Sequence, residues 1–198
     1  AGTWTCTIDV TDRMNAAAEQ ALGLSAADGT AQMPLQLVLT VAEDGAYTLR
    51  YDSDAVRTAL DAYAAALRPT AVESVYAAAE EQGFSREEYD AAMEKAGITM
   101  DDMVAAIFAG VDEEELLSLL TGRSAAITGY CRAESGQLYL ADTAADLTET
   151  ADCLSYTLSD GTMTWTDAQG ELSSQLTEQE QELLRVPLTW TKQAEESK

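Results

Sequence analysis

Residues 2–10 read GTWTCTIDV, and this stretch decides the fold. Apolar residues alternate strictly with polar ones, at Trp4, Cys6, Ile8 and Val10. Because successive side chains of a strand point to opposite faces, the alternation predicts a half-buried β-strand. The chain therefore opens with a strand whose buried face needs further strands as partners.

Seven further segments show strand-like patterns. They are residues 34–41, 47–51, 127–131, 138–140, 154–158, 162–166 and 186–190. Three pairs of them are joined by the turn dipeptides Asp44-Gly45, Ser135-Gly136 and Asp160-Gly161, which are typical of tight hairpins. The other connections are long. If strands pair in sequence order, they form an eight-stranded, antiparallel, up-and-down barrel with every long connection at one end.

The segment 54–122 is helical in pattern and repeats one short phrase. GFSREEY begins at Gly83, GITMDDM at Gly97 and GVDEEEL at Gly110. Each copy is a glycine, an apolar residue, a capping residue, and an acid three positions after the cap. A glycine suits the end of one helix, and the cap with its acid forms a capping box that starts the next. We expect short helices with tight corners, and a helix break at Arg68-Pro69.

The predicted fold class is α+β. Residues 1–53 and 123–193 should form the barrel, with a further helix at 12–22 and a short one at 178–184. Residues 54–122 should form an all-helical insertion between the third and fourth strands, capping one barrel mouth. Residues 194–198 are expected to be a frayed tail.

The composition is strongly acidic. The 198-residue chain has 35 acidic and 11 basic residues and a net charge of −24 at pH 7, and residues 54–122 alone hold 15 acids and 4 bases. Such a surface repels phosphate, so we expect no nucleic-acid partner and poor binding of anionic ligands. No run approaches the roughly 18 apolar residues of a membrane helix, so we expect no transmembrane segment.

The sequence contains no histidine, which is the commonest general base and a common zinc ligand. The acids at Asp101-Asp102 and residues 113–115 fall in first helical turns, where the helix dipole favours negative charge, so we interpret them as helix starts. The methionine-rich stripe at residues 93–103 is interpreted as core between helices. We expect no catalytic residues, no metal site and no cofactor, and we predict that the protein is not an enzyme.

Three cysteines, Cys6, Cys131 and Cys153, lie far apart in the sequence and form no CxxC motif. We interpret them as small buried apolar residues. No disulfide is predicted between Cys131 and Cys153, because we expect them near opposite ends of the barrel, beyond the roughly 7 Å limit between Cα atoms.

The chain resembles the lipocalin-like barrels of the calycin group. The resemblance rests on Gly2-Thr3-Trp4, which matches the family's Gly-x-Trp motif, on the strand order, and on the closing stretch of residues 188–192. In the family a late basic residue packs on the first tryptophan, so the resemblance implies that Lys192 contacts Trp4. The chain looks similar to secreted bacterial lipoproteins with helical insertions. This implies an extracellular or cell-surface location, with a lipid anchor on a removed N-terminal region.

Two functions are open at this point. The protein is either a secreted or cell-surface binding protein that holds a small apolar ligand under a helical lid, or a structural or protein-interaction module with a filled barrel. Small inward residues, Gly129 and Cys6, favour a cavity. Large inward residues favour a filled barrel; they are Trp4, Tyr51, Tyr156, Trp165 and Trp190.

A ligand is expected at the barrel end that carries the long connections, and the charge favours a neutral or cationic one. Its predicted contacts form an apolar wall with one phenol and one indole. They are Ile8, Val10, Leu35, Leu37, Tyr51, Ile127, Leu140, Trp165 and Leu188.

Overall fold

The computed structural model describes residues 1–24, 31–108, 116, 118, 126–148, 152–169 and 184–194. The strands are β1 (Gly2–Asp9), β2 (Pro34–Val41), β3 (Ala46–Tyr51), β4 (Ile127–Glu134), β5 (Gln137–Ala141), β6 (Asp152–Ser159), β7 (Thr162–Gln169) and β8 (Leu188–Lys192). The helices are α1 (Thr11–Leu22), α2 (Ser53–Glu81), α3 (Arg86–Ala96), α4 (Met100–Phe108) and the short 3₁₀ helix η1 (Ala144–Asp146). The helix predicted at 178–184 falls almost entirely outside this part of the chain.

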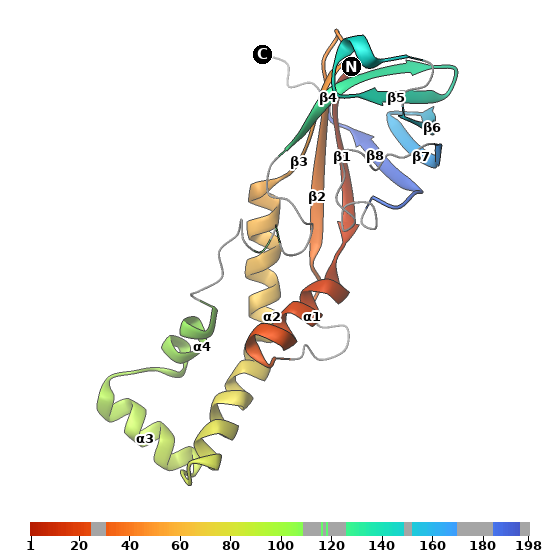
Figure 1. Cartoon of the computed structure of the whole chain (residues 1–198). Helices are drawn as coiled ribbons and strands as arrows, with labels where there is room; N and C mark the ends of the chain where they lie inside the picture. Colours follow the sequence, from red (N-terminus) through yellow and green to blue (C-terminus); the bar gives the residue numbers. More distant parts are fainter. Residues whose placement is uncertain are drawn as a thin grey trace. The chain divides into compact units, whose positions relative to one another are not determined.

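The eight strands form one closed antiparallel barrel in sequence order, and β8 pairs with β1 to close it (Figure 1). In the closing pair, Trp4 lies opposite Lys192. This arrangement confirms the predicted α+β class, the up-and-down order and the helices between β3 and β4. The long connections therefore leave the barrel at one end, and the hairpins lie at the other.

The hairpin turns lie at the dipeptides from which they were predicted. In the β4–β5 turn, Ser135 and Gly136 have φ values of 52° and 79°, and in the β6–β7 turn, Asp160 and Gly161 have φ values of 49° and 75°. Two successive residues with positive φ form the type of turn whose twist matches that of the flanking strands. These turns fix the register of both hairpins.

The chain forms two compact units. The barrel unit contains residues 1–8, 35–56 and 117–198, and the helical unit contains residues 9–34 and 57–116. The connection between β1 and β2 therefore groups with the helices, which the strand pattern does not predict. The predicted capping of a barrel mouth by residues 54–122 stays a prediction.

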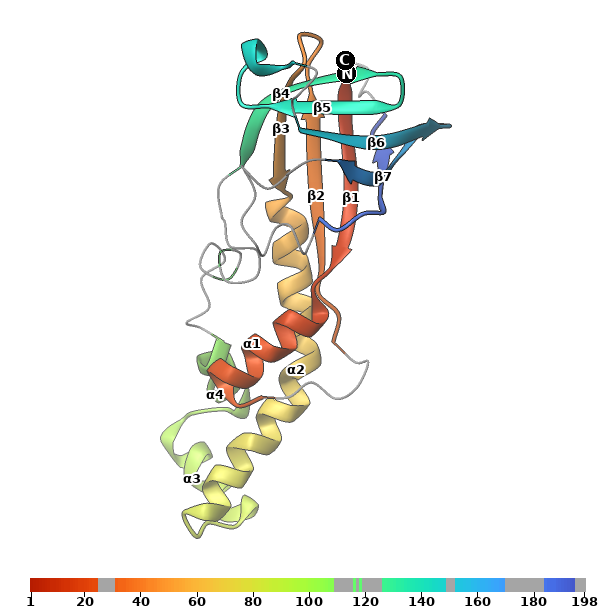
Figure 2. The same ribbon diagram turned by 45° about the vertical axis from the view of Figure 1, so that its right-hand side comes forward.

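Within the helical unit, α1 crosses α2 in both views (Figures 1 and 2). The hydroxyl of Tyr63 on α2 donates a 2.7 Å hydrogen bond to Oδ1 of Asn15 on α1. A small core joins the end of α1 to α2 and α4. Its members are Leu24, Ala71 and Val104, with Leu22, Val72, Met100 and Ile107 packed against them. Met93 is also buried, so two methionines of the 93–103 stripe belong to packed surfaces as predicted.

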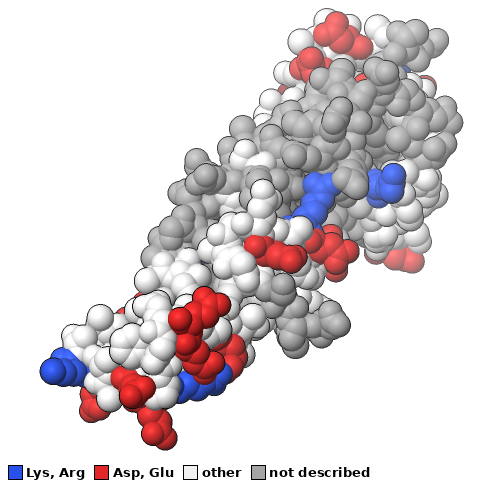
Figure 3. All heavy atoms as spheres, turned by 60° about the horizontal axis from the view of Figure 1, so that its bottom comes forward, with Lys and Arg blue, Asp and Glu red and all other residues white. Residues whose placement is uncertain are grey.

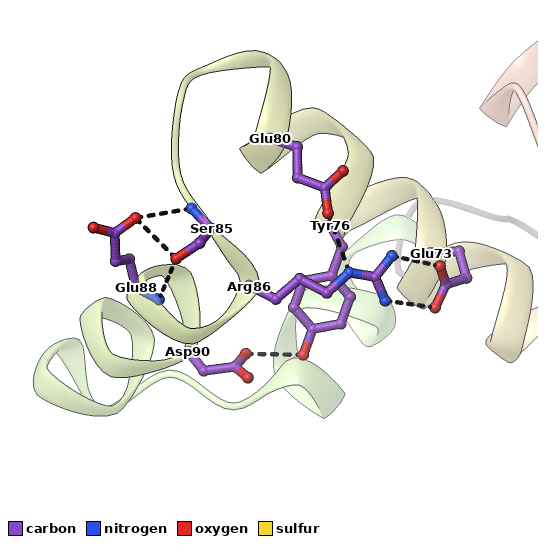
Figure 4. Close-up of polar contacts among 7 residues, drawn as sticks. All are labelled: Glu73, Tyr76, Glu80, Ser85, Arg86, Glu88 and Asp90. Atoms are coloured by element: carbon purple, nitrogen blue, oxygen red, sulfur yellow. Dashed lines mark hydrogen bonds and ion pairs between the residues drawn. The ribbon is translucent and has the colours of Figure 1, made fainter.

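The corners of the helical unit repeat one hydrogen-bond pattern. After α2, the N–H of Gly83 donates to the carbonyl of Glu80 and that of Phe84 to the carbonyl of Ala79, which is a Schellman ending. Ser85 and Glu88 then form the predicted capping box that opens α3 (Figure 4). The next corner, from Gly97 to Asp102, repeats both features. The third copy of the phrase lies outside the described residues, except for Leu116.

The predicted break at Pro69 is wrong, because α2 continues through it from Ser53 to Glu81. Proline removes one backbone donor and crowds the preceding turn, at a cost of about 3 kcal/mol in a helix interior. The flanking residues Leu67 and Ala71 are 1% and 0% exposed. Their packing outweighs the local preference of the proline.

A charged cluster fastens α3 to α2 (Figure 4). Both terminal nitrogens of Arg86 pair with the carboxylate of Glu73, at 3.1 and 2.8 Å, and its Nε contacts Glu80 at 3.2 Å. The guanidinium lies 4.7 Å from the ring centre of Tyr76, whose hydroxyl donates to Asp90. These charges are paired within the helical unit, so the cluster is structural.

Candidate functional site

The inner face of the barrel can be followed through its cross-strand pairs, because paired residues of antiparallel strands share a face. The pairs that trace it are Leu37 with Tyr51, Leu49 with Ile127, Cys131 with Leu140, Leu138 with Leu154, Tyr156 with Trp165, and Trp165 with Leu188. Most of these side chains are apolar and buried. The inner face is thus an apolar lining, and it is the candidate site.

Eight of the nine predicted contact residues lie on barrel strands. Six are buried: Ile8, Leu35, Leu37, Ile127, Trp165 and Leu188. Tyr51 and Leu140 are partly buried. Val10 is also buried, but it follows the end of β1 at Asp9 and belongs to the helical unit, where its N–H donates to the carbonyl of Met33 at 3.0 Å. A ligand-binding role for these residues stays a prediction.

Two tryptophans on adjacent strands carry the unusual polar groups of this lining. Trp165 on β7 and Trp190 on β8 are 6% and 0% exposed, and their ring centres lie 4.7 Å apart with a 45° tilt. Neither indole nitrogen has a hydrogen-bond partner in the described part of the protein. A buried donor without an acceptor costs about 1–3 kcal/mol. Two neighbouring indoles of the lining therefore lack hydrogen-bond acceptors among the described residues.

Sequence reasoning treated Trp190 only as a residue that fills the barrel. The available signal was the alternation Thr-Met-Thr-Trp-Thr at residues 162–166 and Leu-Thr-Trp-Thr at residues 188–191. It places both indoles inward on adjoining strands. It does not reveal that both N–H groups lack acceptors, since that depends on every side chain around them.

Three further polar groups of the lining are neutral. Burial raises the pKa of the Cys6 thiol and of the Cys131 thiol above their ordinary values. Burial also raises the pKa of Tyr47 to about 12, with the nearby Cys131 and Asp142 contributing. These groups therefore stay protonated at neutral pH, and this part of the interior carries thiols and a phenol rather than anions.

Gly129 was expected to leave space in the barrel, but Tyr47 occupies it. A Cβ atom at Gly129 would lie 2.9 Å from a ring carbon of Tyr47, 3.0 Å from its hydroxyl oxygen and 2.6 Å from the carbonyl oxygen of Ala141. The glycine therefore permits close packing of the paired Tyr47. It offers no room for a ligand.

At the hairpin end of the barrel, Lys192 lies over the ring of Trp4. Its Nζ lies 5.8 Å from the ring centre of Trp4, which confirms the contact implied by the family resemblance. A Cβ atom at Gly2 would lie 2.8 Å from Cε of Lys192. The glycine of the Gly-x-Trp motif thus makes room for the lysine chain that lies over the tryptophan.

The opposite end carries a carboxylate. Asp152 starts β6 and pairs with Leu140, so it lies on the inner-face side of that strand. It is one of the 35 acidic residues that, with 11 basic ones, give the chain its net charge of −24. An anionic ligand approaching from this end meets an unfavourable field.

The acidic pair Asp101-Asp102 has structural partners. Asp101 pairs with Arg68, and Asp102 accepts a 2.8 Å hydrogen bond from the backbone N–H of Thr99. Hydrogen bonds from the Thr99 hydroxyl and backbone lower the pKa of Asp102. In the described part of the chain no group of three or more acids and cysteines is placed to hold a metal ion.

Cys131 and Cys153 do not lie near opposite ends of the barrel, so that part of the prediction is wrong. Cys131 pairs with Leu140, and Cys153 pairs with the adjacent Tyr139, so the two thiol positions lie at nearly the same height rather than near opposite ends. They are separated by the whole of β5, about 10 Å at the usual strand spacing, and point to opposite faces. The prediction of no disulfide now rests on this geometry.

The fold and the lining define a class: an α+β protein built on a closed, up-and-down barrel with an apolar interior. No protein-family model, curated protein or solved structure matches the chain. Over the described residues, none of the helices combines the length and apolar character needed to span a bilayer.

Proposed function

We propose that this protein is a lipocalin-like binding protein that holds a small apolar ligand inside its barrel. The observation that carries the proposal is the closed eight-stranded barrel with an apolar lining. Eight strands are about the fewest that can enclose a small ligand, and pockets for such ligands are lined mainly by apolar side chains.

The ligand enters, in this proposal, at the end that carries the long connections. The hairpin end has tight turns, and Lys192 lies there over Trp4. A lid formed by residues 54–122 is part of the proposal, and chain order supports it. The segment leaves the barrel after β3 and returns at β4, at the end opposite the hairpins.

The test is a titration with naphthalene-based fluorescent probes on a matched pair of variants. Leu188 is buried on the inner face of β8, whereas the next residue, Thr189, is exposed. Leu188→Phe adds bulk inside the barrel, and Thr189→Phe adds the same ring outside. We expect saturable binding to the wild type, binding weakened at least tenfold in Leu188→Phe, and little change in Thr189→Phe. Equal binding by all three proteins would place the probe outside the barrel.

The alternative is an interaction module with a filled barrel. Two exposed apolar residues at the helical corners, Phe84 and Ile98, favour it, because such side chains suit a protein partner. If no apolar probe binds the wild type and the folded barrel excludes all of them, the filled-barrel alternative replaces the binding proposal.

The proposal also includes a non-enzymatic role outside the cell. The lack of histidine supports a non-enzymatic role, and the family resemblance supports a location outside the cell. Purification from the native source, followed by mass spectrometry of the N-terminal peptide and of any bound small molecule, tests both the lipid anchor and the ligand.

A further inference from the structure

The barrel lining contains two hydrogen-bond donors for which the described residues supply no acceptor. Trp165 and Trp190 come from adjacent strands, and each is more than nine-tenths buried. Neither Nε1 has an acceptor in the part of the chain that the structure describes. Buried polar groups in proteins are almost always hydrogen-bonded, so these two neighbouring donors are candidates to bind an acceptor that a ligand supplies.

The register shows what surrounds the pair. Trp165 lies opposite Leu188, and Trp190 lies opposite Met163, so both indoles sit on the same inner face with apolar cross-strand partners. Continuing the β1–β8 register from Trp4 and Lys192 brings the small side chain of Cys6 beside Trp190. Both N–H donors thus belong to side chains of one inner face whose cross-strand neighbours are apolar.

We infer that the barrel binds a neutral small molecule whose carbonyl or ether oxygen accepts hydrogen bonds from Trp165 and Trp190. This inference rests on the proposed function and adds the chemical class of the ligand. An indole nitrogen is a donor only, so the complementary ligand group must be an acceptor. Two donors match the two lone pairs of one carbonyl oxygen.

The electrostatics select a neutral acceptor over a carboxylate. The thiols of Cys6 and Cys131 and the phenol of Tyr47 stay protonated, so these groups of the lining carry no charge. The basic group on the inner-face register of β8, Lys192, lies at the hairpin end over Trp4. The acidic residue Asp152 lies on the inner-face side of β6, in a chain whose net charge is −24. Burying an unpaired carboxylate is far more costly than burying a ketone that accepts hydrogen bonds.

The experiment compares three probes of similar shape: methyl naphthyl ketone, isopropenylnaphthalene, in which carbon replaces the carbonyl oxygen, and naphthoate. Affinities are measured for the wild type, Trp190→Phe, Trp165→Phe and the control Trp4→Phe, which removes the third indole, on β1 opposite Lys192. One hydrogen bond contributes a few-fold to about tenfold in affinity. We expect the preference for ketone over hydrocarbon to fall by that factor in the first two variants and to persist in the control.

A second measurement uses the unmodified protein, in case Trp190→Phe folds poorly. Nitrogen-labelled tryptophan gives one indole N–H signal in the NMR spectrum for each of Trp4, Trp165 and Trp190. We expect the ketone to move the signals of Trp165 and Trp190 to the chemical shifts of hydrogen-bonded indoles. The hydrocarbon should move them much less, and with either probe the Trp4 signal should not reach the chemical shift of a hydrogen-bonded indole.

The outcomes separate this inference from the proposed function. If ketone and hydrocarbon bind the wild type equally and shift the indole signals alike, the barrel binds ligands but the indoles do not select an acceptor. If a crystal structure shows only ordered water on the two nitrogens with the ketone bound, the inference is also overturned. Binding of naphthoate more tightly than the ketone overturns the neutral class, and failure of all three probes overturns the proposed function itself.

Discussion

Replacing Trp4 by alanine should remove the packing that closes the hairpin end of the barrel. Trp4 is 8% exposed, and the chain of Lys192 covers it. A buried tryptophan removes about 150–250 Å² from water, which at about 25 cal/mol per Å² is worth about 4–6 kcal/mol. This is an upper bound, because the unfolded chain already buries part of that surface. Large-to-small substitutions in cores usually cost about 3–5 kcal/mol, and we expect Trp4→Ala to fall in this range.

Urea unfolding followed by the fluorescence of Trp165 and Trp190 measures this loss at the barrel itself. With a slope of about 2 kcal/mol per molar urea, the midpoint should fall by about 2 M. Lys192→Met keeps most of the contact area but removes the cation, and should cost only about 0.5–1 kcal/mol. A midpoint for Trp4→Ala equal to that of the wild type would refute the account of Trp4 as part of the barrel core.

Three further predictions concern backbone positions and caps. Pro69→Ala should stabilise the helical unit by about 1–3 kcal/mol, because it restores a helical donor at an exposed position, and thermal unfolding measured by helical circular dichroism checks this. Gly129→Ala should cost about 1–3 kcal/mol in urea unfolding, because its Cβ would clash with the carbonyl oxygen of Ala141 and with Tyr47; an unchanged midpoint would contradict this packing. Hydrogen bonds from Ser85 lower the pKa of Glu88, with the larger effect from the backbone N–H and the smaller from the hydroxyl. A carboxyl group whose pKa is lower in the folded protein stabilises the fold at pH values above its unfolded-state pKa, and this stabilisation is lost as the pH falls through its folded-state pKa. The difference in stability between wild type and Ser85→Ala should therefore shrink on acidification.

The strands could be predicted because the residue pattern within each strand and turn agrees with the place that the segment takes in the barrel. Alternation marks which face is buried, and the dipeptides Ser135-Gly136 and Asp160-Gly161 adopt the positive φ values that their residue types favour. The same agreement explains the helical corners. Gly83 and Gly97 have φ values of 88° and 70°, and the capping residue follows each after one apolar residue. In such segments the sequence within a few residues is sufficient to fix the backbone.

The errors occurred where the outcome depends on distant partners. At Pro69 the burial of Leu67 and Ala71 keeps the helix continuous, and nothing next to the proline in the sequence reports that burial. The heights of Cys131 and Cys153 depend on the stagger between strands: β4 runs three residues beyond Cys131, and the short β5 pairs with its later half. Stagger in a barrel follows from strand tilt, which a list of strand positions does not contain.

The site was only partly predictable for the same reason. The apolar wall follows from alternation, so eight of the nine predicted residues fall on the barrel strands. Val10 does not, because the alternation continues past Asp9 into the residue before α1. The missing acceptors at Trp165 and Trp190 are a property of the assembled interior. No pattern in residues 162–166 or 188–192 distinguishes a satisfied indole from an unsatisfied one.

The two indoles also distinguish between the functions considered for this barrel. In a barrel filled only by its own side chains, an unsatisfied N–H reduces stability, and phenylalanine would provide an aromatic ring at Trp165 and Trp190 without that cost. In a binding protein the same donors are useful, since an acceptor on the ligand removes the penalty and stabilises the folded state in proportion to ligand concentration. The donors then reduce the stability of the empty barrel and increase the affinity for an oxygen-bearing ligand. This exchange of stability for recognition is expected of a functional site and not of a filled core, and it is why we favour the binding protein.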